Sequence, residues 1–236
     1  MKNTSPLIDF HSHILPGVDH GSSGLTETRK QLQIISSAGV DIIVSTSHFY
    51  PNASSVDSFL QKVQTATERM QGADLPPLSI AIGAEVLYCH QLEKMDGLDR
   101  LCVRGTDVLL LEAPMDRWDT AFLDTVEALT KRFTVVLAHI DRYVRVQKEE
   151  IGQLLELGAF AQINGYAFSS LMTRGKLKPF IESDRVVALG SDLHGADAKA
   201  YDQFLAARKR LGDTFDRIMA RSAKLLEQAE FLTPKA

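Results

Sequence analysis

The chain has 236 residues, of which 44% are hydrophobic and 24% are charged, and its formal net charge at pH 7 is −4. These values are typical of a globular protein that can bury a substantial core, and the net charge gives no electrostatic footprint for binding nucleic acid or an anionic membrane. No secretory signal or membrane-spanning apolar run is recognisable, and the two cysteines, Cys89 and Cys102, lack Cys-x-x-Cys spacing. We therefore expect a cytoplasmic protein with reduced thiols.

Seven short apolar runs along the chain are typical of buried strands, and helical patterns separate them. The predicted strands cover, in chain order, residues 7–11, 42–48, 78–86, 108–114, 134–140, 160–165 and 185–194. Between them, apolar residues at helical spacing predict amphipathic helices, as in the stripe of Val56, Phe59, Leu60, Val63 and Met70. Two more helical segments, near residues 204–211 and 215–226, follow the last strand.

Repeated strand–helix–strand units favour an α/β fold with parallel strands and right-handed crossovers. Seven such units suit a closed barrel better than an open sheet. No linker, low-complexity tract or internal repeat divides the chain, so we expect a single domain over residues 1–236. Because the chemistry of such barrels lies at the carboxyl ends of the strands, unusual polar residues should occur there.

Histidines and carboxylates do end six of the seven predicted strands, at His11, His13, His48, Glu85, Glu112, His139, Asp192 and His194. Taken singly, each has an ordinary explanation: a strand-end histidine is often structural, Glu112 could be a paired buried carboxylate, and Asp192 could belong to a helix N-cap. Taken together, they would leave several buried charges unsatisfied, whereas a metal cluster satisfies them all. The series therefore predicts a metal site.

The composition of the series narrows the choice of metal. Imidazole and carboxylate ligands without a thiolate suit Mn, Fe or Zn. With His20, in the loop after the first strand, there are nine candidate ligands, which implies two or three ions rather than one. Clustered metal ions commonly stabilise the attacking and leaving oxygens in phosphoryl transfer.

The motifs "DFHSH", "STSH", "GAEV", "LLLEAP", "AHIDRY" and "SDLH", in this order and spacing, resemble the PHP (polymerase and histidinol phosphatase) superfamily. Within it, the chain is most similar to the bacterial metal-dependent protein-tyrosine phosphatases of capsule and exopolysaccharide operons. The resemblance extends over roughly residues 7 to 200. It implies a distorted TIM-like (β/α)7 barrel with a trinuclear site that commonly uses Mn.

The resemblance also implies how the ligands are shared among three ions. The first ion would be bound by His11, His13, Glu85 and Asp192. The second would be bound by Glu112 and His139, with Glu85 as a bridge. The third would be bound by His48, His194 and His20. Phosphatases of this type usually have an aspartate where His20 stands, so either His20 or Asp19 could be the ligand, and Zn or Fe becomes an alternative to Mn.

Two cationic residues match phosphate-binding positions of these phosphatases. Arg142, in "HIDRY", matches a phosphate-binding arginine, and Lys199 falls where a second arginine is usual. Lys199 is equally well explained as a solvated lysine at a helix end. Trp118 is interpreted as a packing residue, and His90 matches no ligand.

The activity implied by the resemblance is hydrolysis of phosphotyrosine on a protein, with attack on phosphorus by a hydroxide held between metal ions. The implied partner is a bacterial tyrosine kinase of polysaccharide biosynthesis. Neither nucleic acid nor membrane insertion is expected, and a homo-oligomer is compatible with the sequence.

Three alternatives stay open. A small-molecule phosphatase of the histidinol-phosphate type usually has histidine where Glu112 stands. A metal-dependent amidohydrolase would need an eighth strand and often a bridging lysine on the fourth. A non-catalytic metal-binding module that docks a kinase or scaffold is compatible with the departures at His20 and Lys199.

Overall fold

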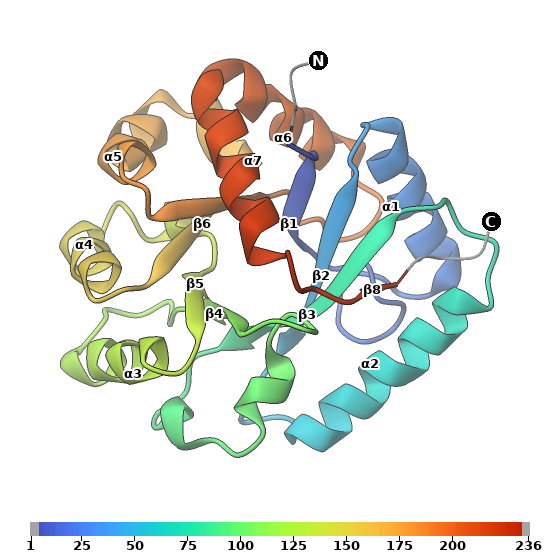
Figure 1. Ribbon diagram of the computed structural model, residues 1–236, viewed down its shortest axis with the longest axis horizontal. Helices are drawn as coiled ribbons and strands as arrows, with labels where there is room; N and C mark the ends of the chain where they lie inside the picture. The colour runs from blue at the N-terminus through green and yellow to red at the C-terminus, as the bar shows by residue number, and fades with distance from the viewer. Residues whose placement is uncertain (1–4, 233–236) are drawn as a thin grey trace.

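The barrel is formed by a sheet of seven parallel strands, whose order in the sheet is the same as their order in the sequence (Figure 1). The computed structural model describes residues 5–232. Its parallel strands are β1 (Ile8–Ser12), β2 (Ile42–Phe49), β3 (Ser79–Leu87), β4 (Val108–Glu112), β5 (Thr134–Leu137), β6 (Phe160–Asn164) and β7 (Val186–Gly190). Every strand pairs in parallel with the next one along the chain. The predicted α/β fold, a TIM-like (β/α)7 barrel, is confirmed.

The ring closes between β1 and the segment that follows β7. The backbone N–H of Asp192 donates to the carbonyl of His11 at 2.8 Å, and that of His13 donates to the carbonyl of Leu193 at 3.1 Å. Gly190 allows this close approach, because a Cβ atom there would lie 2.5 Å from the Cβ of His11. The closure therefore places the first and last predicted ligand motifs side by side.

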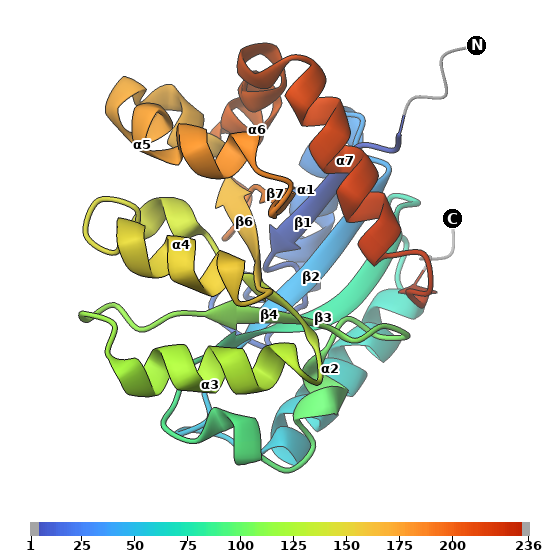
Figure 2. The same cartoon turned by 60° about the vertical axis from the view of Figure 1, so that its left-hand side comes forward.

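Helices surround the sheet (Figures 1 and 2), and residues 5–232 contain seven α-helices. They are α1 (Leu25–Ser37), α2 (Val56–Gln71), α3 (Thr120–Thr130), α4 (Lys148–Glu156), α5 (Leu171–Glu182), α6 (Ala198–Leu211) and α7 (Asp213–Leu225). Side chains of Ser55, Asp119 and Ser170 accept hydrogen bonds from backbone N–H groups in the first turns of α2, α3 and α5. Such caps satisfy donors that the helix itself leaves unpaired.

Short 3-10 helices occupy several loops. They are η1 (Leu92–Lys94), η2 (Leu98–Leu101), η3 (Ile140–Arg142) and η4 (Gly165–Ser169). The turn η3 begins after His139, whose φ of +32° lies in the left-handed region. Asp192 also has a positive φ, of +55°. Because a strand cannot continue through such a residue, β5 ends at Leu137 and β7 at Gly190, earlier than their apolar runs predict.

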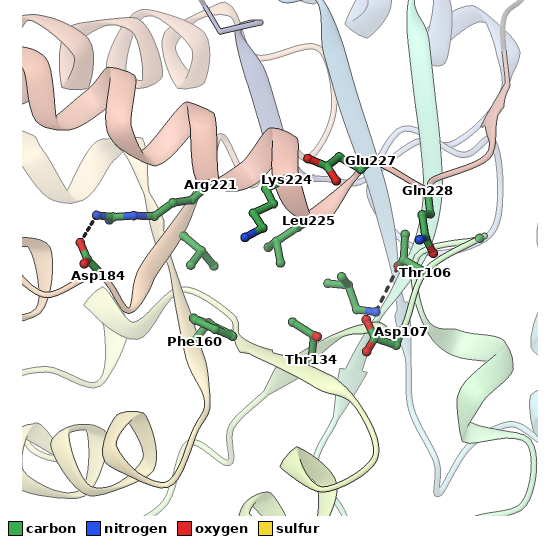
Figure 3. Close-up of a pocket in the computed structure, with 13 residues that line it drawn as sticks. Thr106, Asp107, Thr134, Phe160, Asp184, Arg221, Lys224, Leu225, Glu227 and Gln228 are labelled. Carbon is green, nitrogen blue, oxygen red and sulfur yellow. Dashed lines mark hydrogen bonds and ion pairs between the residues drawn. The ribbon is translucent and has the colours of Figure 1, made fainter.

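The amino end of the barrel is covered by α7 and by a strand that the sequence did not predict. This strand, β8 (Phe231–Leu232), pairs antiparallel with β3. Beside α7 lies a cavity of about 840 Å³, whose lining includes Lys224 and the first residues of β5 and β6, Thr134 and Phe160 (Figure 3). None of the predicted site residues lines this cavity, which is at the opposite end of the strands from them.

No helix within residues 5–232 combines the length and apolar character needed to cross a membrane.

Candidate metal centre

The carboxylate of Glu85, near the carboxyl end of β3, lies among four imidazoles. Its Oε2 atom is 2.9 Å from Nδ1 of His48, 3.2 Å from Nε2 of His11 and 3.4 Å from Nε2 of His13. Its Oε1 atom is 2.7 Å from Nε2 of His139. The register between β2 and β3 sets the closest of the Oε2 contacts, because His48 and Glu85 are directly opposite each other.

Two further carboxylates flank this group. The Oδ1 atom of Asp192 lies 3.4 Å from Nδ1 of His194 and 3.5 Å from Nε2 of His13. The Oε1 atom of Glu112, at the end of β4, lies 3.6 Å from Nε2 of His139. Carboxylates are thus distributed on both sides of the imidazoles.

Four sets of residues bring their nitrogen and oxygen atoms within 4.8 Å of one another, as a metal ion would require. The sets are His13, His48 and His194; His11, His13 and Asp192; His11, Glu85 and His139; and His48, Glu85 and Glu112. The structure therefore brings together eight of the nine predicted ligands. The four sets have residues in common, which is the arrangement needed when metal ions lie close together.

Unsatisfied buried atoms fit the binding of cations here. Glu85 Oε2, Asp192 Oδ1 and His48 Nδ1 are buried, and although they lie close to neighbouring groups, none of their contacts with the described residues has hydrogen-bond geometry. A buried polar atom without a partner costs about 1–3 kcal/mol, and more when it is charged. A metal ion bound by these atoms would remove that cost, and the donor set of imidazoles and carboxylates suits Mn, Fe or Zn.

The pKa shifts of the metal-free chain are also consistent with a cation-binding site. Burial alone would raise the pKa of the Glu85 carboxyl, but the charge of His11 and hydrogen bonding, including the bond between His139 and Oε1, hold this pKa well below its usual value. The pKa of Glu112 is raised, first by burial and then by the negative charge of Glu85. A cation between the two carboxylates would relieve this repulsion. Burial and the proximity of His13 lower the pKa of His194 to about 4, so its imidazole is neutral and able to bind a metal at neutral pH.

Asp19 and His20 have different environments. The Oδ2 atom of Asp19 accepts hydrogen bonds from Nδ1 of His13 at 2.8 Å and from the backbone N–H of His48 at 2.9 Å. The ring of His20 is exposed and stacks against those of His48 and His194, with centroids 4.9 and 4.6 Å apart. Asp19 therefore orients His13, as carboxylates commonly orient metal-binding histidines. Among the described residues, His20 belongs to none of the four ligand sets.

The two predicted phosphate-binding residues also differ. Arg142 ends η3, is about one-third exposed, and pairs with Asp192 and, at 3.5 Å, with Glu112. Its charge therefore lies at the mouth of the metal centre. Lys199 is exposed in the first turn of α6, and within residues 5–232 it forms no ion pair with the centre.

Sequence reasoning missed two residues of β6 that support the ligands. The Oε1 atom of Gln162 accepts a 2.6 Å hydrogen bond from the backbone N–H of His139 and lies 3.2 Å from Nδ1 of His11. Its amide donates to Asn164, whose own amide donates to Asp192 at 2.9 Å. The signal was present in "FAQING", where two polar residues at alternate positions interrupt an apolar strand and share one face.

The remaining predictions concern residues outside the centre. Trp118 is buried and packs against Phe122 and Tyr143, as its interpretation as a packing residue predicts. His90 is exposed and belongs to no ligand set within the described chain. Both cysteines are free, and burial raises the pKa of the Cys102 thiol to about 12, which makes it a poor nucleophile.

The barrel and its cluster of histidines and carboxylates define a class: a (β/α)7 protein with a candidate metal centre at the carboxyl ends of its strands. Residues 7–224 match the family described as "Capsular polysaccharide synthesis, CpsB/CapC", and the chain belongs to this family. The tyrosine-protein phosphatase CpsB of Streptococcus pneumoniae is 30% identical over 211 residues, which cover 82% of this chain and 85% of that protein. The tyrosine-protein phosphatase YwqE of Bacillus subtilis is 23% identical over 238 residues, covering 93% and 91%.

Solved structures share the fold. One matching structure comes from work on YwqE from Bacillus subtilis and CpsB from Streptococcus pneumoniae, which are described as "unique metal-dependent tyrosine phosphatases". The superposition has a TM-score of 0.77 at 21% identity and covers 96% of this chain and 97% of that chain. A histidinol phosphate phosphatase from Lactococcus lactis, in complex with Zn, L-histidinol and phosphate, gives a TM-score of 0.56 at 15% identity, covering 88% and 94%. The family that the motifs predict is therefore confirmed.

We expect Gln162→Leu to lower metal affinity by about 10- to 100-fold, because His11 and His139 lose the amide that positions them. Titration of the metal-free protein with Mn, followed by calorimetry, measures this affinity. Gln147→Leu is the matched control, since it removes another buried amide outside the ligand sets. Unfolding of both metal-free variants in urea separates lost stability from lost binding. Equal Mn affinity for Gln162→Leu and the wild type would contradict a positioning role.

Proposed function

We propose that this chain is a metal-dependent protein-tyrosine phosphatase, a phosphoric monoester hydrolase. The observation that carries the proposal is the convergence of eight histidine and carboxylate residues, with Glu85 among them, next to the guanidinium of Arg142. Membership of the CpsB/CapC family and the names of its relatives support phosphotyrosine as the substrate. We further propose that the substrate protein is a bacterial tyrosine kinase of polysaccharide biosynthesis. Free thiols at Cys89 and Cys102 suit a cytoplasmic location.

The proposed centre holds three ions, with Mn as the expected metal and Fe or Zn as alternatives. Its ligands would be His11, His13, His20, His48, Glu85, Glu112, His139, Asp192 and His194. Bound ions supply Lewis acidity and lower the pKa of water at the site. Arg142 presents a planar pair of N–H donors to the phosphate, which can bind two of its oxygens at once. Gln162 and Asn164 would hold His11 and Asp192 in place while substrate binds and phosphate leaves.

The shared fold of the histidinol phosphate phosphatase keeps a small phosphomonoester as the second candidate substrate. An amidohydrolase is less well supported, because the described barrel has seven parallel strands and the fourth ends in Glu112 rather than a bridging lysine. A metal-binding module without catalysis would not require Arg142 to lie at the mouth of the centre.

Hydrolysis of phosphotyrosine, phosphoserine and histidinol phosphate by the purified protein tests the proposed function. We expect Mn-dependent release of phosphate from phosphotyrosine and from a phosphotyrosyl peptide, and its loss after treatment with a chelator. Glu85→Gln should abolish it, because the central charge among the imidazoles is removed. A clear preference for histidinol phosphate would assign the second candidate function instead. Hydrolysis that persists without metal would contradict the metal-dependent mechanism.

We expect His20→Ala to lower the number of bound ions from three to two, because His20 would complete the third site with His48 and His194. Elemental analysis after dialysis against Mn counts the ions. His90→Ala is the matched control, since His90 is also exposed but lies outside the ligand sets. Three ions retained in His20→Ala would exclude His20 as a ligand.

We expect Arg142→Ala to lower kcat/KM by roughly 10²-fold, about 3 kcal/mol of transition-state stabilisation, with metal content unchanged. Lys199→Ala should cost less, because a lysine is a point charge on a flexible stem, and Lys199→Arg should be neutral or mildly improving. Steady-state kinetics with a phosphotyrosyl peptide and elemental analysis check both expectations. Full activity of Arg142→Ala, or inactivity of Lys199→Arg, would contradict the assigned roles.

A further inference from the structure

Four large hydrophobic side chains stand out as the most exposed of their kind in the described chain. Met115 and Val146 are each 76% exposed, Leu171 is 73% exposed and Met172 is 63% exposed. Apolar side chains that are this accessible and lie close together commonly mark an interaction site rather than a packing defect. We call these four residues the apolar ledge.

The four residues of the ledge belong to three loops that are tied to one another by hydrogen bonds. Met115 follows β4, Val146 follows β5 and η3, and Leu171 and Met172 begin α5 after β6. The side-chain amide of Gln147 donates to the carbonyl of Asp116 at 3.3 Å, which joins the first two loops. The guanidinium of Arg145 donates to Thr173 Oγ1 at 3.3 Å, which joins the second loop to α5.

The ledge lies beside the metal centre, since the same strands supply both. Met115 is three residues beyond Glu112, so the chain between them can span at most about 11 Å. Val146 is four residues beyond Arg142, a span of at most about 14 Å. An extended peptide rises about 3.3 Å per residue, so side chains roughly two to four residues from a bound phosphotyrosine could reach this surface.

The α5 side of the ledge favours an anionic partner. Residues 165–176 carry Arg174 and Lys176 and no acidic side chain, and Arg145 donates to Thr173 in the same segment. On the other side, Arg117 lies beside Asp119, Glu149 and Glu150, so its charge is balanced locally. A second copy of this acidic chain would gain less from such a surface than a phosphorylated peptide would.

We propose that the apolar ledge binds the polypeptide of the phosphorylated substrate through apolar side chains two to four residues from the phosphotyrosine. This inference rests on the proposed phosphatase function and adds the surface that selects among its protein substrates. The buried centre recognises the phosphate, and the ledge contributes affinity that only a peptide with suitably placed apolar residues can use. Free phosphotyrosine is too small to make this contact.

The double variant Leu171→Ser/Met172→Ser tests the proposal without disturbing the core, because both side chains are exposed. Kinetics with Mn would compare free phosphotyrosine with two phosphotyrosyl peptides that carry either leucine or serine at the positions two to four residues from the phosphotyrosine. We expect kcat/KM for the leucine peptide to fall about tenfold, mainly through KM, with no change for free phosphotyrosine. The matched control, Leu157→Ser/Phe231→Ser, removes two exposed apolar side chains away from the ledge and should behave like the wild type.

The outcomes separate this proposal from the proposed function. Wild-type protein that hydrolyses none of the three substrates would overturn the phosphatase function itself. Normal hydrolysis of the leucine peptide by the ledge variant, or an equal loss on all substrates, would overturn the ledge alone. A wild-type dimer that the ledge variant converts to a monomer in sedimentation, with peptide kinetics unchanged, would assign the ledge to self-association and likewise overturn substrate binding.

Discussion

The buried carboxylate of Glu85 is the group on which the candidate centre depends. It lies within 3.4 Å of four imidazoles that belong to β1, β2 and the turns next to β1 and β5. A buried anion is costly unless cations and hydrogen bonds surround it. Its neighbours are distant in the sequence, so Glu85 is compensated only when the barrel has formed. Metal binding and folding are therefore expected to stabilise each other.

Closure of the barrel gives the centre its geometry. The segment after β7 pairs with the end of β1, and this brings Asp192 next to His11 and His13. His139 and Asp192 have left-handed backbone conformations, which do not occur within a regular β-strand. Such conformations cost about 1–3 kcal/mol for a residue other than glycine, and they persist where surrounding contacts determine them, often at functional sites. Gln162 and Asn164 supply those contacts here.

The clustering of the candidate ligands could be predicted from the sequence because strand ends of a parallel barrel share one rim, and this relation holds whatever the exact strand lengths are. Gln162 and Asn164 were missed because an amide in a strand has no distinctive spacing, and its role depends on which strands become neighbours. The strand β8 was missed because two residues carry no periodicity. The early ends of β5 and β7 follow from positive φ at His139 and Asp192, which an apolar run does not reveal.

The candidate metal ligands and the exposed rim suit separable tasks. A cluster of imidazoles and carboxylates can bind metal and phosphate without distinguishing the alcohol to which the phosphate is esterified. Related folds with different substrates, such as the histidinol phosphate phosphatase, are consistent with this separation. Discrimination between a small metabolite and a protein must then come from the loops around the mouth of the barrel. In this chain those loops are tied together by Gln147 and Arg145 and expose apolar side chains. Contact with a rim of this kind favours the binding of a polypeptide, which can bury apolar surface there. The same contact adds little to the binding of a small polar phosphate ester.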